Sequence, residues 1–115
     1  MTAKKITVAF FAVASGAEPV REWLKGLDKT ERVRIGEDIQ ILEYGWPLGM
    51  PVCRPLGQGL YEVRTRLKDR IARVMFAIES SKMVLLHGFI KKSQTTPKDD
   101  LELARKRLKE YRKLS

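Results

Sequence analysis

Residues 60–91 constrain the fold of this chain more than any other segment. They contain three runs rich in β-branched and aromatic residues, which are 60–67, 71–79 and 83–91. Only Lys68-Asp69-Arg70 joins the first two runs, and only Ser80-Ser81-Lys82 joins the last two. Because such short connections turn the chain back on itself, the segment predicts three consecutive antiparallel strands.

Helical patterns precede this segment. Pro19 suits the first turn of a helix whose apolar face consists of Val20, Trp23, Leu24 and Leu27. Residues 28–31 have the form of a capping box, which predicts a second helix that runs to about Tyr44. Its buried face comprises Ile35, Ile39 and Leu42.

A last helix is predicted near the C-terminus. Thr96 suits an N-cap and Pro97 suits the first helical position, so the helix would run from there to about Lys113. Its inward face comprises Leu101, Ala104, Leu108 and Tyr111. The outer face is basic, which suits a surface in contact with water.

The N-terminal segment has two interpretations. Lys4 and Lys5, an apolar run and then Ala12-Val13-Ala14 resemble a short secretory signal with a cleavage site. The run from Ile6 to Ala12 is also rich in β-forming residues and ends before the breaker Gly16, which is typical of a strand. We adopt the strand, because the apolar run is short for a signal.

Prolines and glycines mark residues 47–59 as a loop within the domain. The predicted order is therefore β-α-α-β-β-β-α over a single domain, residues 1–115. We expect an α+β fold in which a small antiparallel sheet packs on a helical hairpin and a C-terminal helix, all on one face of the sheet. No apolar run approaches the length of a membrane span, so no membrane association is expected.

The charge distribution indicates the class of partner. The net charge is +9, yet residues 1–50 carry seven basic and seven acidic residues. The excess therefore lies entirely in residues 51–115, which carry sixteen basic and seven acidic residues. Such a localised positive field favours a polyanion, most often a nucleic acid.

Strand alternation gathers much of this charge on one face of the sheet. Tyr61 and the apolar residues of the strands would face the core, together with Val84, Leu86 and Ile90, and Gly88 would allow a close approach. The opposite face would present Glu62, Arg64, Arg66, Arg73, Met75, His87, Phe89 and Lys91. Arginine binds phosphate bidentately and Phe89 could stack on a base, so this face is a candidate RNA surface; the alternative is an ordinary solvated face.

Other kinds of site have little support. Cys53 is the only cysteine, which rules out an intramolecular disulfide and indicates a small packed residue. No phosphate-binding loop, dinucleotide motif, serine triad or metal-ligand spacing is present, so no cofactor and no metal are expected.

Several segments together carry a family resemblance. These are residues 16–24 (GAEPVREWL), 56–64 (LGQGLYEVR), 73–76 (RVMF) and 85–97 (LLHGFIKKSQTTP). On these motifs the chain resembles the RelE/ParE toxin superfamily, and most closely its HigB-like, phage-derived branch. The resemblance implies a small sheet on a helical hairpin, in agreement with the pattern of the residues.

The resemblance also implies a function. Many members of the superfamily are cytoplasmic toxins that cut mRNA on the ribosome and are neutralised by an antitoxin, in this branch usually a helix-turn-helix protein. The toxin–antitoxin pair then represses its own operon by binding operator DNA. The positions that match the superfamily's basic phosphate-binding residues are Arg64, Arg66, Arg73, Lys91 and Lys92.

The chemistry expected here is attack of an RNA 2′-hydroxyl on the adjacent phosphate without a metal. His87 is the first candidate for proton transfer and Glu62 the second. Related toxins place a catalytic tyrosine, or histidines and an acid, near the C-terminus. In this chain Tyr111 falls on the predicted core face and His87 is the only histidine, so the general acid and base stay open.

Two alternative functions remain at this point. The first is a ParE-like toxin that inhibits DNA gyrase without cutting RNA. The second is a non-enzymatic phage regulator that binds nucleic acid.

Overall fold

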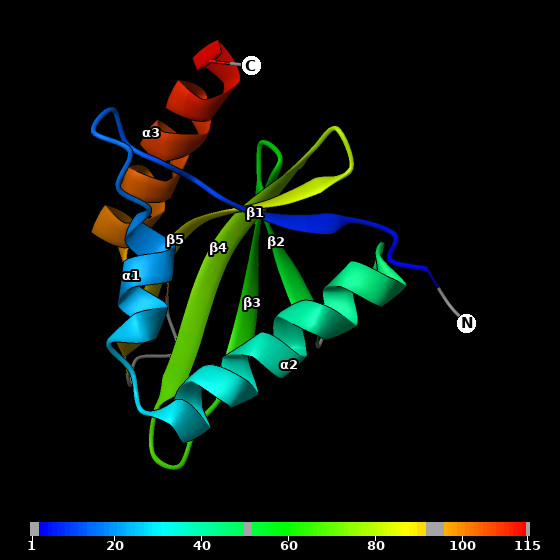
Figure 1. The fold of residues 1–115 in the computed structure, drawn as a ribbon, viewed down its shortest axis with the longest axis vertical. Helices are drawn as coiled ribbons and strands as arrows, with labels where there is room; N and C mark the ends of the chain where they lie inside the picture. Colours follow the sequence, from blue (N-terminus) through cyan, green and yellow to red (C-terminus); the bar gives the residue numbers. More distant parts are fainter. Residues whose placement is uncertain (1–2, 50–51, 92–95, 115) are drawn as a thin grey trace.

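The computed structural model describes residues 3–49, 52–91 and 96–114. These residues form five strands and three helices (Figure 1). The strands are β1 Thr7–Phe10, β2 Cys53–Gly57, β3 Leu60–Arg66, β4 Ile71–Glu79 and β5 Lys82–Lys91. The helices are α1 Pro19–Lys25, α2 Lys29–Gly45 and α3 Lys98–Leu114. The predicted α+β fold class, with its helical hairpin and C-terminal helix, is confirmed.

The strands form one mixed sheet in the order β1-β5-β4-β3-β2. The β3–β4 and β4–β5 hairpins are antiparallel, as their short connections predicted. The prediction of a wholly antiparallel sheet is wrong at one edge, where β1 lies parallel to β5 with Thr7 opposite Lys82. The long helical connection that follows β1 permits this direction, since a parallel neighbour requires a crossover connection.

Strand β2 lies within the stretch that was predicted to be a loop. It pairs antiparallel with β3 at the outer edge of the sheet, with Cys53 opposite Val63 and Pro55 opposite Tyr61. Proline is tolerated on an edge strand because only one side of that strand needs donors for the ladder. The abundance of proline and glycine therefore concealed a strand.

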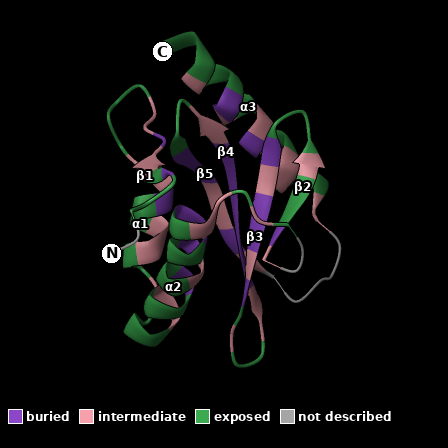
Figure 2. Ribbon diagram, turned by 90° about the vertical axis from the view of Figure 1, so that its right-hand side faces the viewer, coloured by how far each residue is buried: buried purple, intermediate pink, exposed green. Residues whose placement is uncertain are grey.

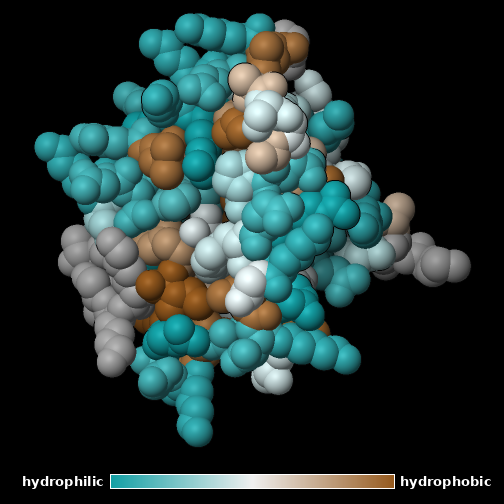
Figure 3. All heavy atoms as spheres, turned by 60° about the vertical axis from the view of Figure 1, so that its left-hand side comes forward, coloured by the Kyte–Doolittle hydropathy of each residue, from teal (hydrophilic) through white to brown (hydrophobic). Residues whose placement is uncertain are grey.

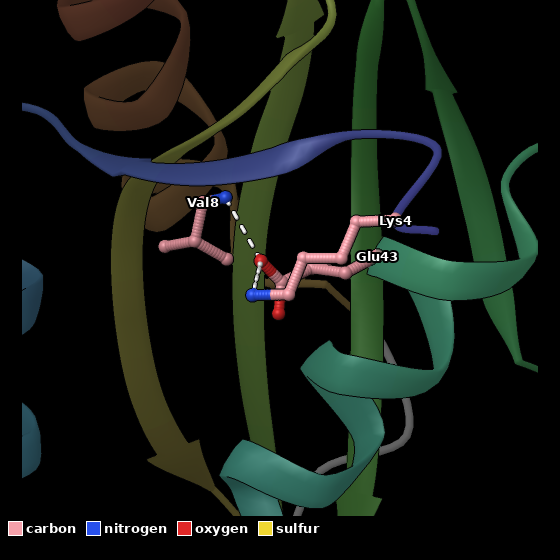
Figure 4. A network of polar contacts seen from close by, with 3 residues as sticks. All are labelled: Lys4, Val8 and Glu43. Carbon is pink, nitrogen blue, oxygen red and sulfur yellow. Dashed lines mark hydrogen bonds and ion pairs between the residues drawn. The ribbon is translucent and has the colours of Figure 1, made fainter. Parts of the chain in front are cut away.

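The interpretation of the N-terminal apolar run as a strand is confirmed, and a buried carboxylate holds this strand in place (Figure 4). Glu43 near the end of α2 is 7% exposed, and its Oε2 accepts the Val8 backbone N–H at 3.1 Å. The same oxygen pairs with Lys4 Nζ at 3.3 Å. The Glu43 carbonyl oxygen accepts the backbone N–H groups of Lys5 and Ile6. Nothing in the sequence pattern predicted this contact.

The helical hairpin α1–α2 covers one face of the sheet (Figure 2). The predicted faces are confirmed: Val20, Ile35, Ile39 and Leu42 are buried, and Trp23, Leu24 and Leu27 pack against them. The close approach predicted at Gly88 is also present. A Cβ at this position would lie 2.5 Å from Cζ3 of Trp23, so only glycine lets α1 lie this close to β5.

Helix α3 packs on the opposite face of the sheet, which corrects the prediction that all helices share one face (Figure 2). Its predicted inward residues Ala104 and Leu108 are buried in a second apolar cluster. Met75, Ala77 and Val84 of the sheet contribute to the same cluster. Because β4 carries apolar residues at almost every position, both of its faces need cover, as in sheets buried between two layers.

Two helix starts differ in detail from the predictions. Asp28 occupies the N-cap of α2, but within the described residues its side chain makes no capping hydrogen bond. Glu31 pairs with Arg70 instead of closing a capping box. Helix α3 begins at Lys98, and the carbonyl oxygen of Pro97 accepts the Leu101 N–H, so Pro97 precedes the first helical position. None of the described helices is long and apolar enough to cross a membrane.

Candidate active site

Strand register brings the predicted site residues into two neighbouring rows. Glu62 of β3 lies opposite Met75 of β4, and Met75 lies opposite His87 of β5. In the adjacent row, Arg64 lies opposite Arg73, and Arg73 lies opposite Phe89. Since residues two apart share a face of a strand, both rows project from the side of the sheet that α3 covers.

A β-bulge in β5 decides which residues share this side with His87. Phe76 pairs with Leu85 and Met75 with His87, which leaves Leu86 as the extra residue between them. Val84 and Leu86 therefore pack in the cluster under α3, on the same side as His87, rather than opposite to it as predicted. Arg107 of α3 donates to the Leu86 carbonyl at 2.8 Å, which fastens the helix to the bulge.

The predicted outward face is a buried face. Glu62 and Arg73 are 0% exposed, whereas the side chains of Arg64 and His87 are 25% and 15% exposed. Strand alternation correctly placed Glu62, Arg64, Arg73 and His87 on one side of the sheet. It carries no information about whether a helix covers that side. The polar side chains accordingly lie at the edge of the second apolar cluster and do not form a solvent-exposed sheet face.

A carboxylate and an arginine form the first pair of the site. Arg64 Nε donates to Glu62 Oε1 at 2.7 Å. Thr96, which precedes α3, donates from Oγ1 to Glu62 Oε2 at 3.5 Å. Both Glu62 oxygens are therefore engaged, and this buried carboxylate is positioned to orient Arg64.

Arg73 is the largest fully buried side chain of the described residues. Burial lowers the pKa of its guanidinium, the nearby charge of Arg64 lowers that pKa further, and Glu62 raises it. Two guanidinium groups thus lie close enough to interact unfavourably, and the carboxylates of Glu62 and Asp100 offset this repulsion in part. A negatively charged group bound at this point would relieve the repulsion.

His87 is paired with an aspartate that sequence reasoning missed. The Nε2 atom of His87 lies 2.6 Å from Oδ1 of Asp100 in the first turn of α3. On its other side the imidazole stacks on Phe89, with ring centroids 5.3 Å apart and planes at 26°. An acceptor on one ring nitrogen leaves the other nitrogen, Nδ1, for proton transfer.

No signal in the sequence singled out Asp100 as a site residue. Acidic residues are favoured in the first turn of any helix, and Asp99 has the same composition and position signal. Only the packing of α3 over β5 distinguishes the residue that reaches His87 from its exposed neighbour. We call Glu62, Arg64, Arg73, His87 and Asp100 the polar cluster.

The remaining predicted site residues lie elsewhere or outside the described part of the chain. Arg66 is exposed and lines a separate cleft between α2 and the β3–β4 turn. Phe89 is 8% exposed, and its ring contacts His87. The side chain of Lys91 and the whole of Lys92 lie outside the described residues.

Residues that were predicted to be structural do pack in the interior. Tyr61 stacks on Phe76 and meets Trp46 edge-on in the core. Tyr111 is half-buried and packs against the second cluster, as its place on the inward face of α3 predicted. Cys53 is buried, its thiol donates to the Leu48 carbonyl, and burial raises its pKa. In the described part of the chain, no group of three or more histidine, cysteine or acidic side chains could hold a metal ion.

Comparison with known proteins places this chain in a family. The family model of phage-derived Gp49-like proteins matches residues 22–109, which is most of the chain. The chain belongs to the Gp49-like family. Gp49-like proteins are a RelE/ParE-like toxin family associated with toxin–antitoxin systems. A search of curated proteins returned no match.

The Gp49-like match includes the entire polar cluster. It begins within α1 and ends within α3, so it spans both the strands that carry the arginines and the helix that carries Asp100. The family assignment agrees with the resemblance drawn from the sequence motifs at the level of the toxin superfamily. It also indicates an antitoxin as partner.

Proposed function

We propose that residues 1–115 form one toxin domain of the HigB-like kind, which cuts mRNA in the ribosome without a metal. The observation that supports this most is that Arg64 and Arg73 lie on strands neighbouring His87, which contacts Asp100 of α3. The two arginines supply charge for a phosphate, and the histidine with its aspartate supplies a group for proton transfer.

The proposed reaction is an internal transfer of the phosphoryl group. The 2′-oxygen of a ribose forms a bond to the adjacent phosphorus while the bond from phosphorus to the 5′-oxygen breaks. The 2′-hydroxyl proton must leave to a base, and the departing 5′-oxygen must receive a proton. The exposed edge of Arg64 contacts the phosphate oxygens, and the buried guanidinium of Arg73 adds its positive charge from below the surface, so both stabilise the negative charge that builds there.

His87 is the proposed proton-transfer residue, because its ring is partly exposed and Asp100 fixes its orientation. Glu62 is less suited to this step. It is fully buried and already accepts hydrogen bonds from Arg64 and Thr96. We therefore assign Glu62 to the orientation of Arg64 rather than to direct contact with RNA.

Dependence on the ribosome follows from access to the site. Arg73 is covered, and only the edges of Arg64 and His87 reach the surface. A freely moving RNA would seldom present its phosphate and 2′-hydroxyl to these edges in the required geometry. An mRNA that the ribosome holds in place offers this alignment beforehand.

The proposed setting is that of a toxin–antitoxin pair in the cytoplasm. A helix-turn-helix antitoxin would neutralise the toxin, and the pair would bind operator DNA. Both expectations come from the HigB-like resemblance. Co-purification with the product of a neighbouring reading frame would test them.

The deciding experiment is cleavage of a defined mRNA by the purified protein, mapped by primer extension with and without translating ribosomes. Cuts within codons only in the presence of ribosomes are expected. Cuts without ribosomes would contradict the ribosome dependence. The absence of cuts in both conditions would contradict the nuclease, and loss of gyrase supercoiling in a parallel assay would then point to a gyrase inhibitor.

A further inference from the structure

A second basic site lies on α3, away from the polar cluster. A groove of about 540 Å³ runs between the C-terminal half of α3 and the turn that joins β2 to β3. The residues that line it are Gln58, Arg105, Leu108, Lys109, Arg112 and Lys113. The basic outer face of this helix was predicted to be an ordinary surface in contact with water. Figure 3 looks onto the side of the molecule that carries α1 and α3, where hydrophilic side chains predominate.

The β2–β3 turn is built to form one wall of this groove. Its three consecutive residues Gly57, Gln58 and Gly59 have positive φ angles of 94°, 55° and 83°. Glycine adopts such angles freely, whereas Gln58 needs support from its surroundings. Arg105 gives that support, since it donates to Gln58 Oε1 at 2.7 Å and to the Leu56 carbonyl at 2.9 Å.

The turn also fits closely against the end of α3. A Cβ on Gly59 would lie 3.0 Å from Nη2 of Arg112, so a larger residue would press on this arginine. The groove is therefore a defined structure in which turn and helix hold each other. It differs in this respect from a row of lysines on an open helix surface.

The groove presents donors and positive charge to a ligand. Arg105 bonds neutral acceptors and keeps its charge, while Arg112 pairs with Glu79 outside the groove lining. Lys109 and Lys113 are exposed, and within the described residues neither forms an ion pair. None of the described residues that line the groove is acidic. A ligand that complements such a lining is anionic.

We propose that this groove binds the phosphate backbone of the single-stranded RNA whose cleavage is proposed above. Asp100 and Lys109 belong to the same helix, where nine residues separate them by roughly 14 Å along the axis and by about half a turn around it. An RNA strand that contacts both the polar cluster and the groove therefore passes around α3. Because none of the described residues that line the groove is aromatic, it binds the backbone without reading the bases.

An acidic protein segment is a poorer fit. A docked amphipathic helix needs a row of apolar contacts along its groove, and among the described residues that line this groove only Leu108 is an apolar residue. The inference rests on the proposed nuclease function for the identity of its ligand. Its test is a binding measurement that does not depend on cleavage.

The test measures binding of a fluorescent single-stranded RNA that carries 2′-O-methyl groups throughout, so that no 2′-hydroxyl can attack. Affinity is determined by anisotropy over a range of salt concentrations. The variant Lys109→Ala/Lys113→Ala removes the two unpaired cations. The matched control Lys5→Ala/Lys29→Ala also removes two exposed lysines, but these are distant in sequence from α3.

The groove variant is expected to bind about tenfold more weakly at low salt. Its plot of log affinity against log salt should be shallower by about 1.4, since each lost phosphate contact on a single strand accounts for about 0.7. The control should lose much less affinity. Equal melting temperatures would show that both variants fold.

Two results would overturn the inference. One is equal RNA affinity and salt dependence for the groove variant and the control. The other is a groove variant that binds RNA as well as the unaltered protein does but no longer binds a glutamate-rich peptide. That result would make the groove a protein-binding site. Cleavage on ribosomes by the unaltered protein, measured in parallel, reports the nuclease function separately, so either proposal can fail while the other stands.

Discussion

At the scale of single residues, Arg73 is where charge and burial conflict most directly. Its guanidinium is fully buried, and burial together with Arg64 lowers its pKa. A folded state that lowers the pKa of a basic group disfavours the cation relative to the unfolded chain. The protein therefore tolerates at this position a group that opposes folding, which is common where the group serves a function.

We predict that Arg73→Met separates activity from stability. Ribosome-dependent cleavage should fall by 100-fold or more, because a charge that stabilises the transition state is lost. The free energy of unfolding should stay unchanged or increase, since Met keeps the side-chain length and removes a cation whose pKa burial and Arg64 lower more than Glu62 and Asp100 raise it. Chemical denaturation and single-turnover cleavage measure the two effects.

Arg66→Met is the matched control for this prediction. Arg66 lies two residues beyond Arg64 on the same strand, but it is exposed and lines another cleft. Its replacement should reduce cleavage far less than Arg73→Met. A comparable loss in both variants would show that general positive charge, and not the polar cluster, supports cleavage.

A second prediction concerns the link between His87 and Asp100. His87→Gln should reduce cleavage by 100-fold or more, as expected for loss of a proton-transfer group. Asp100→Asn should reduce it less, and the double variant should be no slower than His87→Gln alone, because the aspartate acts through the histidine. Asp100→Glu should restore part of the activity that Asp100→Asn loses.

Asp99→Asn provides the control, since Asp99 is the exposed neighbour in the same helical turn. It removes the same charge at the start of α3 without touching His87. Additive losses for the His87 and Asp100 substitutions would contradict the proposed coupling. Single-turnover rates on programmed ribosomes give the required comparison.

At the scale of elements, the position of α1 depends on one glycine and that of α3 on one bulge. Trp23 lies directly over Gly88, so α1 approaches β5 closely. The bulge at Leu86 turns its carbonyl towards α3, where Arg107 donates to it. Both contacts hold helices on either side of the strand that carries His87.

We predict that Gly88→Ala destabilises the fold by about 1–3 kcal/mol, because the added methyl group overlaps the Trp23 ring and α1 must shift. Gly36→Ala is the control. Gly36 is an exposed position in α2 with no described atom within 4 Å of an added Cβ. It should increase stability by about 0.5–1 kcal/mol through helix propensity.

Urea unfolding of the two glycine variants measures both changes. Equal stability of Gly88→Ala and the unaltered protein would show that α1 can move away from β5 at little cost. A loss of stability in Gly36→Ala would show that α2 requires a glycine for a reason other than space.

At the scale of the whole molecule, the sheet separates two apolar clusters that different helices close. The first contains Val20, Ile35 and Phe76 on the α1–α2 side, and the second contains Met75, Leu86 and Leu108 on the α3 side. Cooperative unfolding is expected, since β4 and β5 contribute to both clusters. The thiol of Cys53, which lies in the first cluster, can report on this unfolding.

We predict that Cys53 reacts with iodoacetamide only when the protein unfolds. Burial raises the pKa of this thiol, so the folded protein keeps it protonated at a pH where an exposed thiol ionises. Alkylation at pH 8.5 should be slow in buffer and fast in denaturant. Rapid alkylation of the folded protein would reveal local opening of the β2 edge.

The same thiol makes a pH-dependent contribution to stability. Because its pKa is raised in the folded state, the contribution is complete below the ordinary thiol pKa and is lost as the pH rises above it. Cys53→Ala should therefore lose less stability than the unaltered protein between pH 8 and pH 10. Equal losses would contradict the burial of the thiol.

Elements with strong local patterns could be predicted from the order of residues alone. The antiparallel strands of residues 60–91, the buried faces of the three helices and the close approach at Gly88 follow from periodicity and turn length. The grouping of Glu62 with Arg64, Arg73 and His87 followed from strand alternation alone. Each of these predictions used only local signals in the chain, such as residue periodicity, turn length, strand alternation and the missing side chain of Gly88.

How the layers come together depends on contacts between distant segments, which local patterns do not predict. The edge strand β2, the parallel direction of β1, the position of α3 over the arginines and the pairing of Asp100 with His87 all join distant segments. Local patterns show that a helix has an apolar face, but they do not specify which face of a sheet will cover it. The burial of Arg73, and with it the character of the candidate site, depends on that choice because α3 excludes water from one side of the sheet.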